Sequence, residues 1–406
     1  MNFPLFVAKR YFGSSVKARF ITLISRISMV GVGVEVMALI LILSVFNGLE
    51  DFQKGLFQTF DPDLKIIDKN SPRFNISQEK LKQIKALSGI TFINPVLEDQ
   101  ALLRFGNKQV VASFKGVDDS FLNANRLKKQ VVEGDYFLKS DGQSFALVGI
   151  GVFLNMGMSF ENVVEPVEAW YPNHQSLRKF SINEEAIRSN IFYPAGVIEV
   201  EQTFDNQTVI VPLDWMNDLV GAENKVSGYE IMLASGVDEK RVQQQIKQIL
   251  GNTFSIQTRD EQHAMLLKAI KIEKLFVFLI MAFVMGIASF TLFYSLSLLV
   301  IEKRKDLRTL LAIGISRSQL FKTIMWVGFL ICFSGAILGM IFGFIFAWAQ
   351  QTFGIIGLGI PNALIDAYPI KMELMDFVWT SLVVLTITTL ASIIPARKAV
   401  EMTFKQ

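Results

Sequence analysis

The chain has one cysteine and two histidines among its 406 residues, and these low numbers limit the disulfides and metal sites that it can form. Because Cys332 is the only cysteine, no intrachain disulfide can form, so a domain in an oxidising compartment must be held by its own core. His174 and His263 lie far apart, and neither has a second histidine or a cysteine at metal-ligand spacing. The sequence therefore predicts no metal site and a structural or solvated role for each histidine.

Motifs for nucleotide binding and covalent catalysis are also missing. The sequence holds no G-x-x-x-x-G-K-S/T loop, which would cradle ATP phosphates, and no G-x-S-x-G nucleophile elbow. The formal net charge is only +3, and the basic residues cluster beside apolar runs, so no nucleic-acid partner is expected. We predict no catalytic residue and no cofactor bound by this chain; if the protein is energised, another chain supplies the energy.

Apolar residues are abundant: 51% of the chain is hydrophobic, and the mean hydropathy is +0.38, which is typical of a membrane protein. Three apolar spans, about 275–301, 323–349 and 376–396, reach the ~20 residues that cross a bilayer. A fourth begins near residue 27 and is apolar apart from Glu35. A secretory signal peptide is the alternative for this span, but the preceding basic stretch is long and no small-residue cleavage site follows. We therefore predict four membrane helices.

The positions of Lys and Arg predict the orientation, because basic residues in short flanking segments stay in the cytosol. They precede the first span, separate the second from the third and follow the fourth, whereas Lys371 is the only one between the third and fourth spans. Both termini are therefore expected in the cytosol. The predicted organisation is residues 1–49 with the first membrane helix, an external domain at 50–270, and a membrane domain at 271–406.

The external domain is predicted to mix α and β structure. Strand-like LKIID at 64–68 is followed by a helix that Ser77 can cap and by a second strand, and the same order recurs between residues 229 and 257. These two β-α-β-like units flank a β-rich middle that contains a hairpin turning at Gly106 and Asn107. The expected fold class is a four-helix membrane protein with an α+β domain between its first two membrane helices, a split ferredoxin-like fold with a β-rich insertion.

Apolar residues recur at helical spacing on both stretches that join this domain to the membrane, after the first span and before the second. The pattern predicts that both membrane helices continue outward as a two-helix stalk. The alternative is a pair of amphipathic helices lying on the membrane surface.

Two features within the spans stand out. Gly335, Gly339 and Gly343 recur every four residues and leave one helix face without side chains, so another helix can approach closely. The sequence leaves open whether that helix belongs to this chain or to a second subunit. Glu35 is a costly carboxyl group in an apolar span. It either binds a polar or cationic group, lies on a transport path, or faces Ser or Thr as a protonated or hydrogen-bonded side chain.

The segment VIEKRKDLRTLLAIGISRSQLF, followed by the glycine-ribbed helix, resembles the signature of FtsX-like permeases, which are membrane subunits of ABC transporters. The resemblance implies a coupling helix at about 303–320 that sits in a groove of a cytosolic ATPase. A solvated basic loop is the alternative. By this resemblance, the residues expected to contact the ATPase or to shape the loop are Glu302, Lys303, Lys305, Asp306, Arg308 and Gly314.

Two further segments narrow the resemblance. The N-terminal stretch that ends in LSVFNG and the stretch DEQHAMLLKAIKIEKLFVF resemble the lipoprotein-releasing LolC/LolE type. This chain departs from that type at Glu35 and at Glu161 and Asn162, which replace a GD-type turn. The resemblance also implies an external domain with a MacB-like periplasmic core.

What the resemblance implies about function is mechanical. An ATPase dimer similar to LolD, carrying the ATP and Mg, would drive two permease subunits, identical or different, in the inner (cytoplasmic) membrane. The external domain would then move an acylated lipoprotein toward a periplasmic carrier similar to LolA. A hydrophobic surface could receive the acyl chains, or could simply pack the stalk; it consists of Val45, Phe46, Leu49, Phe52, Met265 and Leu266. The alternatives are a MacB-like export permease and an FtsX-like regulator of a cell-wall hydrolase.

Overall fold

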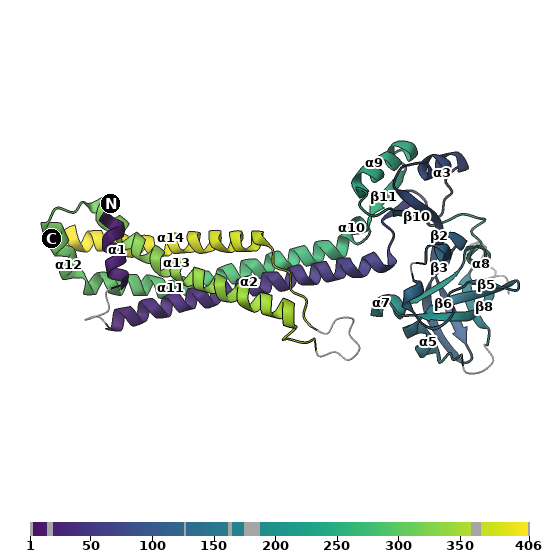
Figure 1. The fold of residues 1–406 in the computed structure, drawn as a ribbon, viewed down its shortest axis with the longest axis horizontal. Helices are drawn as coiled ribbons and strands as arrows, with labels where there is room; N and C mark the ends of the chain where they lie inside the picture. The colour runs from purple at the N-terminus through teal and green to yellow at the C-terminus, as the bar shows by residue number, and fades with distance from the viewer. Residues whose placement is uncertain are drawn as a thin grey trace. The chain divides into compact units, whose positions relative to one another are not determined.

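The computed structural model describes residues 3–13, 19–125, 127–160, 165–173, 187–358 and 367–404. His174, Glu161 and Asn162 lie outside the described residues. The chain forms two compact units (Figure 1). The membrane unit comprises residues 1–52 and 265–406, and the sheet unit comprises residues 53–264.

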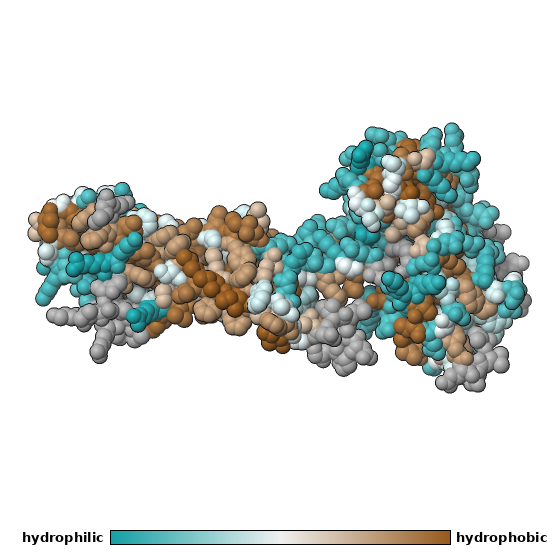
Figure 2. Space-filling view, in the orientation of Figure 1, coloured by the Kyte–Doolittle hydropathy of each residue, from teal (hydrophilic) through white to brown (hydrophobic). Residues whose placement is uncertain are grey.

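The membrane unit is entirely helical in its described regular structure. Its helices are α1 (Phe3–Gly13), α2 (Arg19–Phe60), α11 (Ala264–Glu302), α12 (Arg304–Ala312), α13 (Arg317–Phe353) and α14 (Leu374–Phe404). The described residues include four helical segments long and apolar enough to cross a membrane, which confirms the four predicted spans: Ser25–Gln58, Ala264–Glu302, Arg317–Phe353 and Leu374–Phe404. Figure 2 shows apolar surface over the middle part of these helices.

All four of these described helices are longer than a bilayer requires, and α2 and α11 are the longest of them. The helix α2 has 42 residues and α11 has 39, whereas ~20 residues are enough to cross the hydrocarbon core. The helix α2 is continuous through the stretch in which the sequence predicts an outward extension, whereas α11 begins at Ala264, within the corresponding stretch before the second span. Pro395 lies within α14, which continues past the predicted end at 396 to Phe404.

The described strands of the sheet unit form one eleven-stranded sheet, ordered β11-β1-β10-β2-β3-β9-β6-β8-β4, with β5 beside β6 and β7 between β2 and β8. Most neighbours are antiparallel, but β3 with β9 and β6 with β8 are parallel. The strands are β1 (Leu64–Asp68), β2 (Ile90–Phe105), β3 (Lys108–Val117), β4 (Val131–Gly134), β5 (Lys139–Ser140), β6 (Gln143–Gly149), β7 (Val167–Pro172), β8 (Ile187–Ile198), β9 (Thr208–Pro212), β10 (Gly228–Leu233) and β11 (Phe254–Thr258).

Short helices connect these strands. They are α3 (Gln78–Lys85), α4 (Asp119–Asn123), the 3-10 helix η1 (Lys128–Gln130), α5 (Ile150–Met156), α7 (Gln202–Asp205), α8 (Leu213–Val220), α9 (Glu239–Leu250) and α10 (Arg259–Gln262). The predicted strand-helix-strand orders correspond to β1-α3-β2 and β10-α9-β11. Ser77 occupies the N-cap of α3, as predicted, but its side chain makes no capping hydrogen bond. The hairpin of β2 and β3 turns at Gly106 and Asn107, and Gly106 has a φ of +55°, which glycine adopts without strain.

Separate apolar cores hold the two parts of this sheet. One core lies where α9 packs against β1, β10 and β11, and includes Leu64, Ile66, Ile231 and Ile246. A second lies against the insertion, where Phe114 stacks on Trp215 with ring centroids 5.8 Å apart, and a third includes Phe121 and Ile210. These cores replace the disulfides that a chain with one cysteine cannot make.

Asp205 makes the stability of the insertion depend on pH. Burial raises the pKa of its carboxyl group from 3.8 to about 6, although the N–H groups of Val200 and Glu201 partly offset this. Since the folded pKa is the higher one, the contribution of Asp205 to stability is fully present below about pH 4 and is lost as the pH rises from about 4 to about 6. The expected cost is on the order of 1 kcal/mol after allowance for screening by water.

Hydrogen exchange of the β8-α7-β9 peptides in the purified full chain measures this effect. We expect less protection at pH 7 than at pH 4, after correction for intrinsic rates, and a flat profile in Asp205→Asn. The same pH dependence in the variant would show that another group is responsible.

Candidate functional site

The charged segment between α11 and α13 is a short helix followed by a tight turn. The predicted helix at about 303–320 is divided in the structure: α12 ends at Ala312, and α13 begins at Arg317. Gly314 separates the two helices with a φ of +96°, a conformation that other residues rarely adopt. Ser316 then starts α13 through a capping box, in which its Oγ accepts from the Gln319 N–H and its own N–H donates to Gln319 Oε1.

Apolar side chains anchor this segment in the membrane unit. Leu307 is only 1% exposed, and Ile315 is also buried. Both belong to one core with residues of the long helices, such as Leu299, Ile324 and Ala399. Because protein interiors are close-packed, displacement of α12 must move the helices it touches.

The charged residues predicted as ATPase contacts surround these anchors. Glu302, Lys305, Asp306 and Arg308 are exposed, and Lys303 is half-buried. Lys303 Nζ lies 3.1 Å from Asp306 Oδ2 and 5.8 Å from the centre of the Tyr11 ring on α1. Burial, and secondarily the charge of Asp306, raises the pKa of Tyr11 to about 12. The segment therefore presents charge on one side while α1 and the bundle support it on the other.

The glycine face of α13 packs against α2 of the same chain. A Cβ atom on Gly335 would lie 2.3 Å from the carbonyl oxygen of Met29, and one on Gly339 would lie 2.3 Å from that of Gly33. Gly343 is less constrained, because its Cβ would meet Ile40 at 3.4 Å. The sequence left the partner of this face open, and the structure places α2 there.

A buried polar cluster joins α2, α11 and α14, and the sequence did not predict it. Asn47 on α2 and Asp376 on α14 are 4% and 5% exposed, and Asn47 Nδ2 donates to Asp376 Oδ2 at 2.6 Å. Lys274 on α11 donates to Asn47 Oδ1 at 2.5 Å and lies 3.3 Å from Asp376 Oδ1. Three helices that are distant in the sequence are therefore joined by one charge-assisted network.

The segment before α14 also contacts α2, close to Asn47. The Lys371 N–H donates to the Ser44 carbonyl at 3.0 Å, and Asn47 donates to the Lys371 carbonyl. Lys371 pairs with Asp51. Gly48 permits this approach, because a Cβ atom there would lie 2.2 Å from the carbonyl oxygen of Pro369.

Replacing Asp376 with alanine is expected to destabilise the membrane unit by about 2 kcal/mol, because Lys274 and Asn47 would lose their buried acceptor. Thermal unfolding of the full chain in detergent measures this loss. Asp260→Ala is the control, since its contact with Lys54 is exposed and 3.7 Å long. Equal unfolding temperatures for both variants would contradict a stabilising role for the cluster.

The remaining predicted site residues lie mostly along α2. Val45, Phe46, Leu49 and Phe52 are half-buried, whereas Leu266 is exposed and Met265 is 91% exposed. Glu35 is half-buried, and its buried Oε2 has no hydrogen-bond partner among the described residues.

The described residues include no group of three or more His, Cys, Asp and Glu side chains that could hold a metal ion. His263 instead contacts Asp61, with its Nε2 2.5 Å from Asp61 Oδ2.

The sequence of the α11–α14 region matches a known family. Residues 278–404 match the FtsX-like permease C-terminal family.

The similarity to particular proteins extends over nearly the whole chain. LolE of Haemophilus influenzae, a lipoprotein-releasing system transmembrane protein, is 20% identical over 99% of this chain and 98% of its own length. LolC of Neisseria meningitidis is 22% identical over 97% of this chain and 95% of its own, and LolC of Haemophilus influenzae is 25% identical over 84% of each. The predicted resemblance to FtsX-like permeases of the LolC/LolE type is confirmed.

Some solved structures have a limited likeness to part of this chain. The extracellular domain of the YknZ transporter from Gram-positive bacteria has a TM-score of 0.35 and 12% identity, covering 48% of this chain and 99% of that domain. The periplasmic region of MacB from Actinobacillus actinomycetemcomitans has a TM-score of 0.34 and 14% identity, covering 50% of this chain and 91% of that region.

Proposed function

We propose that this chain is the permease subunit of an ABC transporter that releases lipoproteins from a membrane. The observation that carries the proposal is α12, a charged helix between two membrane helices whose Leu307 and turn residue Ile315 are fixed in the bundle core. It lies in the part of the chain that matches the FtsX-like family, and the relatives along the whole chain are lipoprotein-releasing proteins. A separate ATPase dimer, similar to LolD, pushes this segment when it closes on ATP.

Topology supports this arrangement. The basic residues flanking the spans favour a cytosolic position for both termini and for α12, in an inner (cytoplasmic) membrane. The sheet unit then lies in the periplasm. Its order β11-β1-β10-β2 with α3 and α9 supports the finer assignment, a ferredoxin-like half split by a β-rich insertion, as in a MacB-like periplasmic core.

The energetics explain why such a protein needs an ATPase. Removing an acyl chain from a bilayer costs about 0.8 kcal/mol per buried CH₂, so a lipoprotein with three chains does not leave unaided. ATP and Mg belong to the ATPase in this proposal. A second permease subunit and a periplasmic carrier similar to LolA complete the path, and the α2 surface from Val45 to Phe52 with Met265 and Leu266 faces the lipid chains.

Depletion of the chain in cells tests the proposal. Lipoproteins destined for the outer membrane are expected to accumulate in the inner membrane, as measured by membrane fractionation. Normal sorting of lipoproteins, together with a defect in drug export or in cell-wall hydrolysis, would refute lipoprotein release and favour an export or regulatory permease.

A further inference from the structure

The ends of α2 and α11 that belong to the sheet unit are attached to it with almost no intervening loop. Three residues, Asp61, Pro62 and Asp63, separate α2 from β1. On the other side, α10 follows β11 directly, and His263 alone separates α10 from α11. Pro62 is buried and its φ is fixed by its ring, which further limits movement of the first connection.

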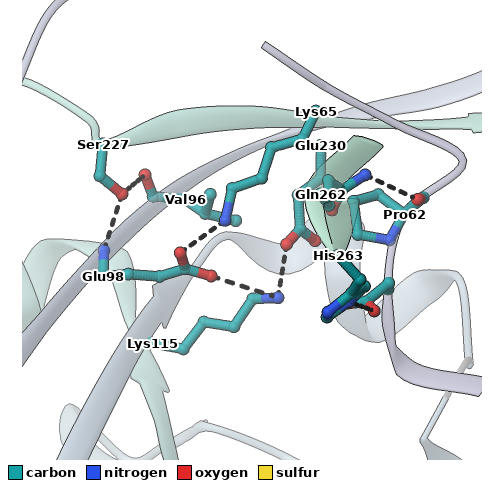
Figure 3. A network of polar contacts seen from close by, with 10 residues as sticks. Pro62, Lys65, Val96, Glu98, Lys115, Ser227, Glu230, Gln262 and His263 are labelled. Carbon is teal, nitrogen blue, oxygen red and sulfur yellow. Dashed lines mark hydrogen bonds and ion pairs between the residues drawn. The ribbon is translucent and has the colours of Figure 1, made fainter. Parts of the chain in front are cut away.

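Side chains tie these two connections to each other. The His263 ring stacks on Phe57 of α2 with centroids 3.6 Å apart and planes within 8°. Its Nε2 lies 2.5 Å from Asp61 Oδ2, and Gln262 Nε2 donates to the Pro62 carbonyl at 3.3 Å. Figure 3 shows Gln262, Pro62 and His263 gathered beside the charged residues of the sheet.

A second pair ties the same connections to the sheet. Arg259 on α10 lies 2.5 Å from Asp63 Oδ1, and both side chains are about 85% buried. The other carboxylate oxygen of Asp63 accepts from the Leu233 N–H at the end of β10, at 2.7 Å. Asp63 therefore links the exit of α2, the last residue of β10 and the segment that leads into α11.

Four strands of the sheet carry a network of two lysines and two glutamates, Lys65, Glu98, Lys115 and Glu230 (Figure 3). Lys65 on β1 donates to Glu98 on β2 at 2.6 Å, and Lys115 on β3 donates to Glu230 on β10 at 2.5 Å. Glu230 is only 2% exposed. Burial raises the pKa of Asp61, whereas His263 and Lys115 lower it. The carboxylate of Asp61 at the end of α2 therefore interacts electrostatically with Lys115 of the sheet.

We propose that the Asp61–His263 and Asp63–Arg259 pairs form a rigid joint through which movement of α2 and α11 is passed into the sheet unit. The inference rests on the proposed function, in which the energy enters at α12. A flexible hinge would need solvated loop residues free to change φ and ψ, whereas here the connections are short, half-buried or buried, and doubly paired. Arg259 and His263 are positioning residues, because they act through the helices they hold.

Arg259→Gln tests the joint, with Arg259→Lys as the conservative variant that keeps a cation beside Asp63. In a complex with the ATPase, Arg259→Gln is expected to lower lipoprotein release about tenfold while ATP hydrolysis stays within about twofold, and Arg259→Lys is expected to restore most of the release. Lys139→Gln is the matched control, since Lys139 pairs with Asp214 at 2.8 Å in the same unit but both side chains are exposed.

Hydrogen exchange of the purified full chain distinguishes failure of the joint from failure of the proposed function. Peptides covering 57–63 and 258–264 are expected to be protected in the wild type and to exchange about tenfold faster in Arg259→Gln, with the rest of the sheet unchanged. If Arg259→Gln unfolds the whole sheet, the same experiments use His263→Phe instead. This variant keeps the ring stacked on Phe57 but loses the contact with Asp61. Rapid exchange in the wild type, or full release by a folded variant with both pairs removed, would overturn the joint. Protected peptides without any ATP-driven release would refute the function alone.

Discussion

Replacing Gly339 with leucine is expected to prevent assembly of the membrane unit, whereas the same change at Gly286 is expected to be tolerated. A Cβ atom on Gly339 would lie 2.3 Å from the carbonyl oxygen of Gly33 and 2.9 Å from Cβ of Val36, both on α2. No rotamer relieves a clash with backbone, so α2 and α13 would have to separate and lose their whole interface. Gly286 is a matched control, because it lies in α11, another membrane helix, and a Cβ atom there meets nothing within 4 Å.

The measurement is the yield of monodisperse full chain after detergent extraction, with its unfolding temperature. Close helix contacts in membranes depend on small residues, because lipid offers no hydrophobic drive for association. We expect little or no monodisperse Gly339→Leu protein, and Gly286→Leu close to wild type. Equal yields and unfolding temperatures for the two variants would contradict the α2–α13 packing.

Reversing the charge of Asp306 is the second change with a large expected effect. Asp306 lies in the first turn of α12, is exposed, and contacts Lys303, while the neighbouring Leu307 holds the helix in the core. The cost to the helix itself is about 1 kcal/mol, from the lost ion pair and the unfavourable helix dipole, so α12 remains folded. At an interface with a cytosolic ATPase, however, a misplaced charge opposes binding by several kcal/mol.

Asp306→Arg is therefore expected to reduce ATP-driven lipoprotein release by at least about tenfold and to weaken copurification of the ATPase. Glu401→Arg is the control, because it makes the same change of charge at an exposed position near the C-terminus, on the same side of the membrane in the proposed topology. Wild-type release by Asp306→Arg, with the ATPase still bound, would argue that α12 is only a solvated loop.

Local sequence patterns were sufficient to predict most of the regular structure. The four spans follow from apolar length alone, and β1, β10 and β11 fall within one residue of the predicted strands because period-two apolar patterns lie between turn residues. The end of α12 was missed, although a signal was present: Gly314 followed by Ser316 and Gln319 is a helix stop followed by a capping box.

Contacts between distant segments could not be predicted in the same way. The glycine spacing of α13 predicts a close neighbour, but only the tertiary fold identifies that neighbour as α2. Asn47, Lys274 and Asp376 carry no periodic signal, and Asn47 is 329 positions from Asp376. The resemblance includes the segments around Asn47 and Lys274 but predicts no role for either residue. The structure shows that both contact Asp376 or each other in a network that joins three helices.

Reconstitution tests whether this chain and an ATPase together release lipoproteins from a membrane. The chain, its candidate ATPase and an acylated lipoprotein are incorporated into proteoliposomes, a soluble carrier is added, and the lipoprotein in the soluble fraction is measured with ATP, without ATP and with a non-hydrolysable analogue. We expect release that requires ATP hydrolysis and both chains. ATP hydrolysis by a stable complex without release of lipoprotein, or no association between the two chains, would contradict it.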